Sequence, residues 1–366
     1  MFLPHELIIE ILLRLPVKSL LRFKSVCKLW FSLISHDPHF ANSHFQLSSA
    51  TPNRRILLIS YKTHESLSID FEASLDDDSA SVPLNLDYMF LEDSTNFEVT
   101  GSCRGFVLIR GSLNIYLWNP TTGVHKQIPL SPFGSKYGSN LDDNYFYGFG
   151  YDHSTEDYLV VLMSYHYSDE PTLHLEYFSL KANTWKQVEG PHFPYSSEIE
   201  PTGGLLYKGA IHWLAYRDDL RSDVIVAFDL MERKLSYMHL PHDSDGDPLQ
   251  CGGLWVYGEY LSVYTMNDTD DKVEIWVMKE YKVNSSWTLV LTIDLSVCPN
   301  MAFSPLCCTK SGDIIGAGER DRLVKYDKNG QFLELHSYPK YDLIWKMTMY
   351  INSLLSLPGD GDNKQA

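Results

Sequence analysis

Closely spaced carboxylates are the first candidates for chemistry in this sequence. Three aspartates alternate with other residues in Asp243-Ser-Asp245-Gly-Asp247, and such a spacing suits a divalent cation. A calcium loop that begins at Asp243 needs a glutamate at its twelfth position, but that position is Leu254. We therefore interpret this segment, and the acidic runs 76–78 and 268–271, as solvent-facing loops, and we predict no metal site.

Other residue types that could carry chemistry also lack a usable pattern. Gly148-Phe-Gly150 misses the third glycine and the following helix of a dinucleotide fingerprint, and the chain has no GxSxG, HExxH or phosphate-binding loop. Cys307 and Cys308 are adjacent in an expected strand, so their side chains point to opposite faces and do not share a metal. Cys27 falls on an apolar helical face, where we expect a buried thiol. We therefore predict that the protein is not an enzyme and that it binds no cofactor.

A basic segment stands at the front of an acidic chain. The segment Pro16–Trp30 contains four cations and no acid, although the whole chain has a formal net charge of −17. Residues 1–40 hold five Lys/Arg and three Asp/Glu, a balance of +2, which leaves 25 and 44 for the rest, a balance of −19. A field of that sign repels phosphate backbones, so nucleic acid is excluded as a partner.

The compartment follows from cysteines and hydropathy. The six cysteines are widely spread and form no CxxC pair, which indicates reduced thiols in the cytoplasm or nucleus. Glu6, Glu10 and Arg14 interrupt the first apolar stretch, and no run approaches the ~18 apolar residues of a membrane span. We expect a soluble intracellular protein that does not bind membranes.

Residues 1–40 have a helical period. Leu7, Ile8, Ile11, Leu12 and Leu15 recur at helical spacing between Pro4, which can start a helix, and Pro16, which must end it. Two further short helices are expected before His36. Forty residues cannot bury this much apolar surface alone, so part of it must contact something else. Residues 41–53 are expected to be a linker, and Phe40 and Phe45 suggest that this connection packs against its neighbours.

From Arg54 onward the chain shows short β-branched and aromatic runs bounded by Gly, Pro, Asn or Asp. One element, an apolar strand that ends in an aromatic residue before a turn, recurs at intervals of 47 to 60 residues. Its anchors are Phe71, Trp118, Phe178, Phe228, Trp276 and Tyr326. A period near ~50 is typical of kelch-like propeller blades. The alternative is an array of β-sandwiches, which needs no fixed period.

The expected fold class is therefore α+β multidomain, with three helices followed by an all-β propeller of about six blades over residues 54–357 and a disordered tail at 358–366. Glycine-rich segments such as Gly203-Gly204 and Gly252-Gly253 would let backbones crowd toward a central channel. The strand Arg55–Tyr61 and the C-terminal strand around Met347–Leu355 are predicted to share one blade, because closure removes sheet edges.

The first forty residues resemble the F-box, in which Leu-Pro opens the first helix and Val-Cys-x-x-Trp closes the third. The resemblance implies docking on a Skp-type adaptor within a cullin-RING ubiquitin ligase. The matching adaptor-binding positions are Leu3, Pro4, Ile8, Ile11, Leu12, Leu15, Leu20, Leu21, Val26, Cys27 and Trp30. Lys18, Arg22, Lys24 and Lys28 would lie at the rim and complement an acidic adaptor. Only Met1 and Phe2 precede Leu3, so we expect a slightly weaker first-helix contact.

The remainder resembles the plant F-box-associated domain of the kelch-like class. The segments that carry this resemblance are CRGFVLIRGSLNIYLWNPTTG, YGFGYDHSTEDYLVV, EYFSLKANTWKQV and GAIHW. The resemblance implies a non-catalytic substrate receptor that binds an unknown protein target through loops on one propeller face. Aromatic candidates there are Tyr145, Phe146, Tyr147, Tyr165, Tyr167 and Trp255, although each also suits the core. A glycan-binding F-box protein and a kelch-type oxidase are the alternatives.

Overall fold

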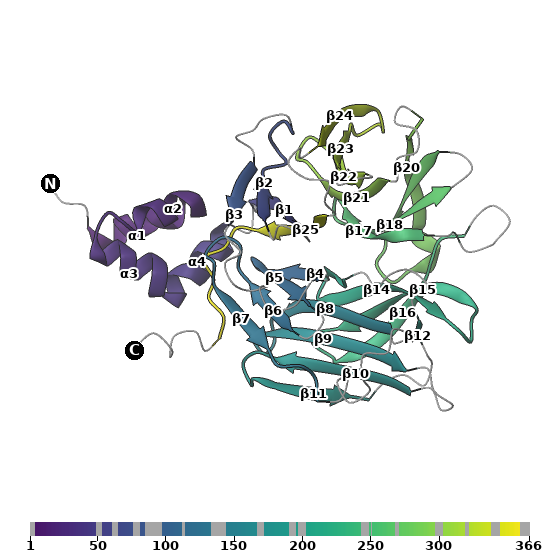
Figure 1. The fold of residues 1–366 in the computed structure, drawn as a ribbon, viewed down its shortest axis with the longest axis horizontal. Helices are drawn as coiled ribbons and strands as arrows, with labels where there is room; N and C mark the ends of the chain where they lie inside the picture. The colour runs from purple at the N-terminus through teal and green to yellow at the C-terminus, as the bar shows by residue number, and fades with distance from the viewer. Residues whose placement is uncertain are drawn as a thin grey trace.

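A computed structural model describes most of the chain as a helical module beside a ring of sheets (Figure 1). The described residues are 4–48, 53–60, 65–75, 81–84, 97–111, 114–132, 144–166, 172–189, 195–196, 203–242, 249, 251–267, 271–296, 303–318, 322–337 and 345–358. No helix within these ranges is both long enough and apolar enough to cross a membrane.

Four helices form the N-terminal module. They are α1 (His5–Leu13), α2 (Val17–Phe23), α3 (Lys28–His36) and α4 (Pro38–Ser48). Pro4 and Pro16 stand at the N-caps of α1 and α2, where a missing backbone N–H costs nothing. The fourth helix differs from the sequence expectation, since residues 41–48 of the predicted linker are helical. Asp37 explains its start, because the Asp37 carboxylate accepts hydrogen bonds from the backbone N–H groups of His39 and Phe40 at 2.9 and 3.0 Å.

Six antiparallel sheets follow and form the propeller that the sequence predicts. Blade 1 contains β25 (Trp345–Ile351), β1 (Arg54–Ser60), β2 (Ser66–Ile69) and β3 (Ser81–Leu84). Blade 2 contains β4 (Glu98–Cys103), β5 (Phe106–Arg110), β6 (Ile115–Trp118) and β7 (His125–Ile128). Blade 3 contains β8 (Asn144–Asp152), β9 (Asp157–His166), β10 (Thr172–Ser179) and β11 (Thr184–Val188).

The second half of the ring repeats this plan. Blade 4 contains β12 (Tyr195–Ser196), β13 (Leu205–Tyr207), β14 (Ala210–Arg217), β15 (Ser222–Asp229) and β16 (Lys234–His239). Blade 5 contains β17 (Cys251–Tyr257), β18 (Tyr260–Asn267), β19 (Lys272–Met278) and β20 (Trp287–Asp294), with a short 3₁₀ helix, η3 (Asn284–Ser286). Blade 6 contains β21 (Phe303–Cys308), β22 (Ile314–Gly318), β23 (Arg322–Tyr326) and β24 (Phe332–Ser337).

The ring closes in blade 1, where the two ends of the β region meet. Strand β25 pairs antiparallel with β1 from Arg54↔Ile351 to Ser60↔Trp345. The predicted sharing of one blade by the first and last strands is confirmed. Closure leaves neither of these two strands as an unpaired edge on that side.

The recurring aromatic element marks the third strand of each blade. Trp118, Phe178, Phe228 and Tyr326 lie at or near the ends of β6, β10, β15 and β23, and each is at most 2 % exposed. Phe71 follows β2 and is equally buried. Trp276 is the exception and is half-buried. Met278 occupies the equivalent position in blade 5. It pairs with Leu261, the second residue of β18, just as Phe228 in blade 4 pairs with Ile211, the second residue of β14.

Glycines do allow the inner strands to crowd. A Cβ atom added to Gly203 would lie 2.4 Å from the backbone of Thr100 in β4, and one on Gly253 would lie 2.7 Å from the Tyr264 ring. Neither position accommodates a side chain without displacement of its neighbour. The first strands of the blades therefore line a narrow centre, and a cavity of about 1780 Å³ runs from this channel toward the helical module.

Candidate functional site

The helical module exposes several large apolar side chains. The six that are between 48 % and 59 % exposed are Leu7, Ile11, Val26, Leu29, Phe31 and Leu47. Leu7 and Ile11 are four residues apart in α1 and therefore lie on one side of the helix. Val26 and Leu29 flank the start of α3. Such a concentration of exposed apolar area on one small module is typical of a protein-binding surface.

Exposed cations accompany this apolar surface. Lys18, Arg22 and Lys28 are exposed, and none of them forms an ion pair with a carboxylate in the described part of the chain. Lys24, the fourth cation of the basic segment, is half-buried. An exposed charge beside an apolar interface contributes more to association rate and partner choice than to affinity. This arrangement suits an acidic partner.

The structure divides the predicted adaptor-binding residues into three groups. Pro4, Ile11, Val26 and Cys27 are exposed, whereas Ile8, Leu15, Leu21 and Trp30 are half-buried against the core. Leu12 and Leu20 are 1 % and 0 % exposed. Leu3 lies outside the described residues. Buried side chains present no area to a partner, so we assign Leu12 and Leu20 to the core of the module.

One sequence expectation about this surface needs correction, and three exposed residues were not among the predicted positions. Cys27 was expected to be buried on a helical face, but it is exposed. The reason is that α3 begins at Lys28, so Cys27 is an extended N-cap residue with φ −160°. The predicted set also omitted Leu7, Leu29 and Phe31. Leu7 could have been found, because it shares the helical stripe of Ile11.

Helix α4 attaches the helical module to the propeller. Phe40, Ala41 and His44 are buried, which confirms that this connection packs instead of running free. The His44 ring contacts the connection between α1 and α2, because its Nε2 lies 2.8 Å from the Leu15 carbonyl oxygen in hydrogen-bond geometry. A helix packed on both sides fixes the orientation of its neighbours.

Arg104 links blade 2 to α4. It occupies the turn between β4 and β5, and its guanidinium carbon lies 4.7 Å from the Phe45 ring centroid and 4.0 Å from that of Tyr151. The same group donates to Asn42 Oδ1 and Tyr158 Oη, both at 3.3 Å. Arg104 has φ +51°, a left-handed conformation that disfavours side chains other than Gly, Asn and Asp.

A C-terminal segment, residues 352–358, forms the second link. The buried Asn119 amide donates to the carbonyl oxygens of Ser353 and Leu355 at 3.1 and 3.2 Å, while its Oδ1 accepts from the backbone of Thr121 at 2.9 Å. The Trp-Asn-Pro-Thr motif thus holds this segment against blade 2. In Figure 1 the segment continues from β25 toward α4.

One apolar cluster unites all these parts. It contains Leu12, Val17, Leu20, Ile34, Phe40 and Ala41 from the helices, Phe106 and Leu108 from blade 2, Phe149 and Val160 from blade 3, and Leu354, Leu355 and Leu357 from the C-terminal segment. A shared core of this size makes the helical module and the propeller one packed body.

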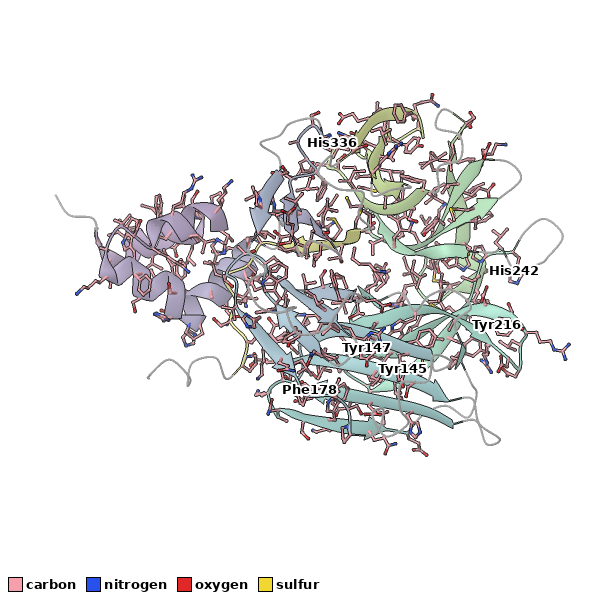
Figure 2. All side chains as sticks on the ribbon, in the orientation of Figure 1. Tyr145, Tyr147, Phe178, Tyr216, His242 and His336 are labelled. Carbon is pink, nitrogen blue, oxygen red and sulfur yellow. The ribbon has the colours of Figure 1, made fainter. Side chains whose placement is uncertain are left out.

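The predicted aromatic candidates for target binding are mostly internal. Phe146, Tyr147 and Trp255 are 1 %, 9 % and 3 % exposed, and Figure 2 shows Tyr145 and Tyr147 among the side chains of the lower blades. The side chain of Tyr165 and the whole of Tyr167 lie outside the described residues, as do most segments that join successive blades. Because buried rings cannot stack on a ligand, we assign Phe146, Tyr147 and Trp255 to the packing of the blades.

Metal and cysteine chemistry find no support at the described residues. No group of three or more His, Cys, Asp or Glu side chains in these ranges is arranged to hold a metal ion; the segment 243–247 lies outside them. Burial raises the pKa of the Cys103 and Cys251 thiols to about 12. Both therefore remain protonated and unreactive at neutral pH.

These features define a class of protein, an F-box module joined to a propeller. Residues 2–42 match the F-box domain, and residues 54–330 match the F-box associated beta propeller domain. The chain therefore belongs to the F-box proteins that carry this associated propeller. The F-box match covers α1 to α3 and the start of α4, and the propeller match begins at β1.

Relatives from Arabidopsis thaliana support this assignment. F-box protein CPR1 is 28 % identical over 80 % of this chain and 73 % of its own length. F-box/kelch-repeat protein At3g44120 is 28 % identical over 85 % of this chain and 84 % of its own. F-box protein ETP2 is 29 % identical over 80 % and 77 %. Solved structures are more distant: a chain of the mitotic checkpoint complex matches with TM-score 0.40 and 11 % identity over 67 % of this chain and 78 % of its own.

Proposed function

We propose that this chain is the substrate-recognition subunit of a Skp–cullin–F-box ubiquitin ligase. The F-box would bind a Skp-type adaptor through Leu7, Ile11, Val26 and Leu29, with Lys18, Arg22 and Lys28 at the rim. The observation that carries this proposal is the exposed apolar and basic surface on a module whose own core is already packed. Such a surface needs a partner, and its charge suits an acidic one.

The propeller would hold a target protein, and the chain itself would catalyse nothing. Ubiquitin transfer would come from the associated ligase, while this subunit raises the local concentration of the acceptor lysine. The two links through Arg104 and Asn119 support this role, because a packed junction keeps the adaptor and the target face at a fixed distance. The target binds, in this proposal, at the face where successive blades are joined.

Localisation in the cytoplasm or nucleus belongs to the same proposal. Cys27, Cys103, Cys251, Cys307 and Cys308 are free thiols, which suits a reducing compartment. The glycan-binding alternative lacks a supporting observation, because Phe146, Tyr147 and Trp255 are buried and offer no stacking platform.

The test is reconstitution with a purified Skp-type adaptor and its cullin. We expect the full chain to elute with both proteins as one complex, and a chain with Ile11→Ser and Val26→Ser to elute alone. Proximity labelling with and without proteasome inhibition would then reveal targets that accumulate only when degradation is blocked. Failure of the folded wild-type chain to bind the adaptor would refute the proposal.

A further inference from the structure

The outer strand of blade 5 is an exposed sheet edge. Strand β20 stands last in the order β17-β18-β19-β20 and pairs with β19 alone among the described strands. Within the described part of the chain, residues 288–293 form no backbone–backbone hydrogen bond outside this ladder. One side of β20 therefore keeps a row of backbone donors and acceptors that no neighbouring strand satisfies.

The six outer strands differ in how this edge is protected. Short length, proline and charged side chains all discourage another strand from pairing with an edge. The other five outer strands are four to six residues long. Each of them contains a proline or a charge: Pro83 in β3, Lys126 in β7, Lys186 in β11, Lys234 in β16 and Glu334 in β24. Strand β20 has eight residues, and its only charged residue is the last one, Asp294.

Two successive apolar side chains are exposed along β20. Leu289 and Val290 are each 40 % exposed. A β-bulge leaves Val290 without an opposite residue in β19, because Leu289 and Leu291 take the two flanking pairs. A bulge can itself protect an edge, and β24 has one at Leu333, but there the charged Glu334 follows directly. In β20 no charge accompanies the bulge, so the edge offers apolar side chains together with unsatisfied backbone groups.

The two ends of this edge limit what can pair with it. A Cβ atom added to Gly330, in a turn of blade 6, would lie 2.8 Å from the Thr292 carbonyl oxygen, so the free edge runs from Trp287 to Leu291. The hairpin 279–286 stands at its other end. A second copy paired antiparallel through the same strand would bring its hairpin against the blade 6 turn of the first. A single extended segment about 17 Å long, at ~3.4 Å per residue, fits between the two obstacles.

The charges of the hairpin indicate the chemistry of that segment. Lys279 and Lys282 are exposed, and neither forms an ion pair with a carboxylate of the described residues. Glu280 is the only acid between residues 279 and 286, so the hairpin has a net charge of +1. Val283 adds a further apolar side chain, 39 % exposed. A complementary segment is therefore apolar along β20 and acidic beside the hairpin.

We propose that the free edge of β20 binds an extended apolar segment of another protein, with an acidic residue beside the hairpin, as a fifth strand of blade 5. Backbone hydrogen bonds along Trp287–Leu291 would supply affinity, and contacts with Leu289 and Val290 would select apolar side chains. This inference goes beyond the proposed function, which places the target on the face where successive blades are joined. It is also independent of adaptor binding, because the edge belongs to the propeller and not to the F-box.

Titration of the full-length protein into a fluorescent peptide tests the proposal by anisotropy. The peptide Asp-Val-Thr-Val-Thr-Val-Asp has an acid at both ends and therefore suits either strand direction. The same peptide N-methylated at its valines and threonines keeps the side chains but loses these backbone donors, so it should bind at least about tenfold more weakly. Leu289→Ser with Val290→Ser in the protein should weaken binding of the parent peptide by about tenfold. Lysines in place of both aspartates of the peptide should weaken it by about threefold.

Leu333→Ser is the matched control, because Leu333 is also an exposed leucine at the bulge of an outer strand, but in a strand that contains Glu334. It should leave the affinity unchanged, and all variants should keep the wild-type far-ultraviolet circular dichroism. The proposal is overturned if the wild-type chain does not bind the parent peptide, if the N-methylated peptide binds equally well, or if Leu333→Ser weakens binding as much as the Leu289/Val290 variant. Self-association of the wild-type chain that the Leu289/Val290 variant abolishes would assign the edge to a second copy and overturn it as well.

Discussion

The Arg104 guanidinium lies 4.7 Å from the centroid of the Phe45 ring, so an inner turn of blade 2 is in direct contact with helix α4. The contact has a backbone cost, since Arg104 is left-handed at φ +51°. Blade 3 takes part in the same contact, because the Tyr151 ring of β8 lies 4.0 Å from the guanidinium carbon. A residue kept in a disfavoured conformation by four partners, Phe45, Tyr151, Asn42 and Tyr158, is a fixed point of the junction.

Replacement of Arg104 should weaken this junction without straining the turn. Arg104→Asn keeps a residue that tolerates the left-handed region and should lower stability by about 1–2 kcal/mol, the scale of a partly desolvated cation–π contact. Phe45→Ala should give a similar loss, and the double variant should lose less than the sum of the two. Urea denaturation of all four proteins measures the coupling.

Arg221→Asn provides the control for that cycle. Arg221 is exposed in a blade 4 turn and has φ +50°, so it shares the residue type and the backbone conformation of Arg104. It should change stability by less than about 0.5 kcal/mol. Additive losses for Arg104→Asn and Phe45→Ala would show that the two side chains do not stabilise each other.

Surface and core positions of the F-box should respond differently. Ile11→Ser with Val26→Ser should reduce adaptor binding at least about tenfold while the melting temperature changes little, because both side chains are half or more exposed. Met231→Ser, at a 65 % exposed position of the propeller, is the control and should bind normally. Normal adaptor binding by the Ile11/Val26 variant, measured by calorimetry, would exclude this surface.

Leu12→Ala should act through folding. Leu12 is 1 % exposed and packs in the cluster shared with the propeller, so its truncation should cost about 2–5 kcal/mol of stability. Where the variant is still folded, its affinity for the adaptor should stay within about twofold of wild type, since the side chain reaches no partner. Urea denaturation and calorimetry at low temperature separate the two effects; a tenfold affinity loss with unchanged stability would place Leu12 in the interface.

Much of the fold could be predicted because it depends on local patterns. The change from helical to alternating period near Arg54, and the recurrence of Trp118, Phe178, Phe228 and Tyr326, reflect the same third-strand position in successive blades. The predicted anchor of blade 5 was Trp276 instead of Met278, because both residues are apolar and lie two positions apart on the same face of β19. Only the pairing register distinguishes them.

The junction could not be predicted, because its contacts join residues far apart in the chain. Nothing near Arg104 indicates Phe45, and nothing near Asn119 indicates Ser353 and Leu355. Helix α4 was missed for a local reason. Asp37-Pro38 reads as a break, although an Asp N-cap followed by proline is also a common helix start.

Protonation of His212 should destabilise the propeller at low pH. This residue is 0 % exposed, its Nε2 lies 2.8 Å from Tyr281 Oη, and burial lowers its pKa to about 4. The unfolded chain binds this proton below about pH 6.5 while the folded chain does not, so stability falls as pH decreases from 6.5 to 4. Between pH 6.5 and 4, the free energy of unfolding of the His212→Gln variant should fall by about 3 kcal/mol less than that of the wild type. Urea denaturation at each pH measures both. Parallel curves for the two proteins would contradict the assignment.

Loss of the last strand should destabilise the whole ring. A chain that ends at Lys346 lacks most of β25, which leaves β1 without its partner and opens blade 1. We expect the protease to cut in several blades, and we expect the whole propeller to unfold in a single transition at a lower denaturant concentration. A chain that ends at Pro358 keeps β25 and the C-terminal segment and should resist the protease. Protection of blades 3 to 5 in the shorter chain would show that closure is not needed.

The position of α4 determines where the two modules can be separated. The change from helical to alternating period near Arg54 suggests one such chain, which begins at Arg54 and would bind the target but not the adaptor. Such a chain lacks Phe40, Ala41 and Phe45, so it would expose Arg104 and the apolar residues of the C-terminal segment. A chain from Asp37 onward keeps the N-cap and the whole of α4, and it should be the more soluble and the more stable.

Sedimentation distinguishes the two chains, and hydrogen exchange of the full protein tests how α4 packs. Sedimentation should find the longer chain monomeric and the shorter one prone to association, and neither should bind the adaptor. Hydrogen exchange of the full protein should show protection at Ala41 and His44, which are buried in α4. Rapid exchange throughout 38–48, together with equal solubility of the two chains, would mean that α4 is a tether. The target would then not be held at a fixed distance from the adaptor.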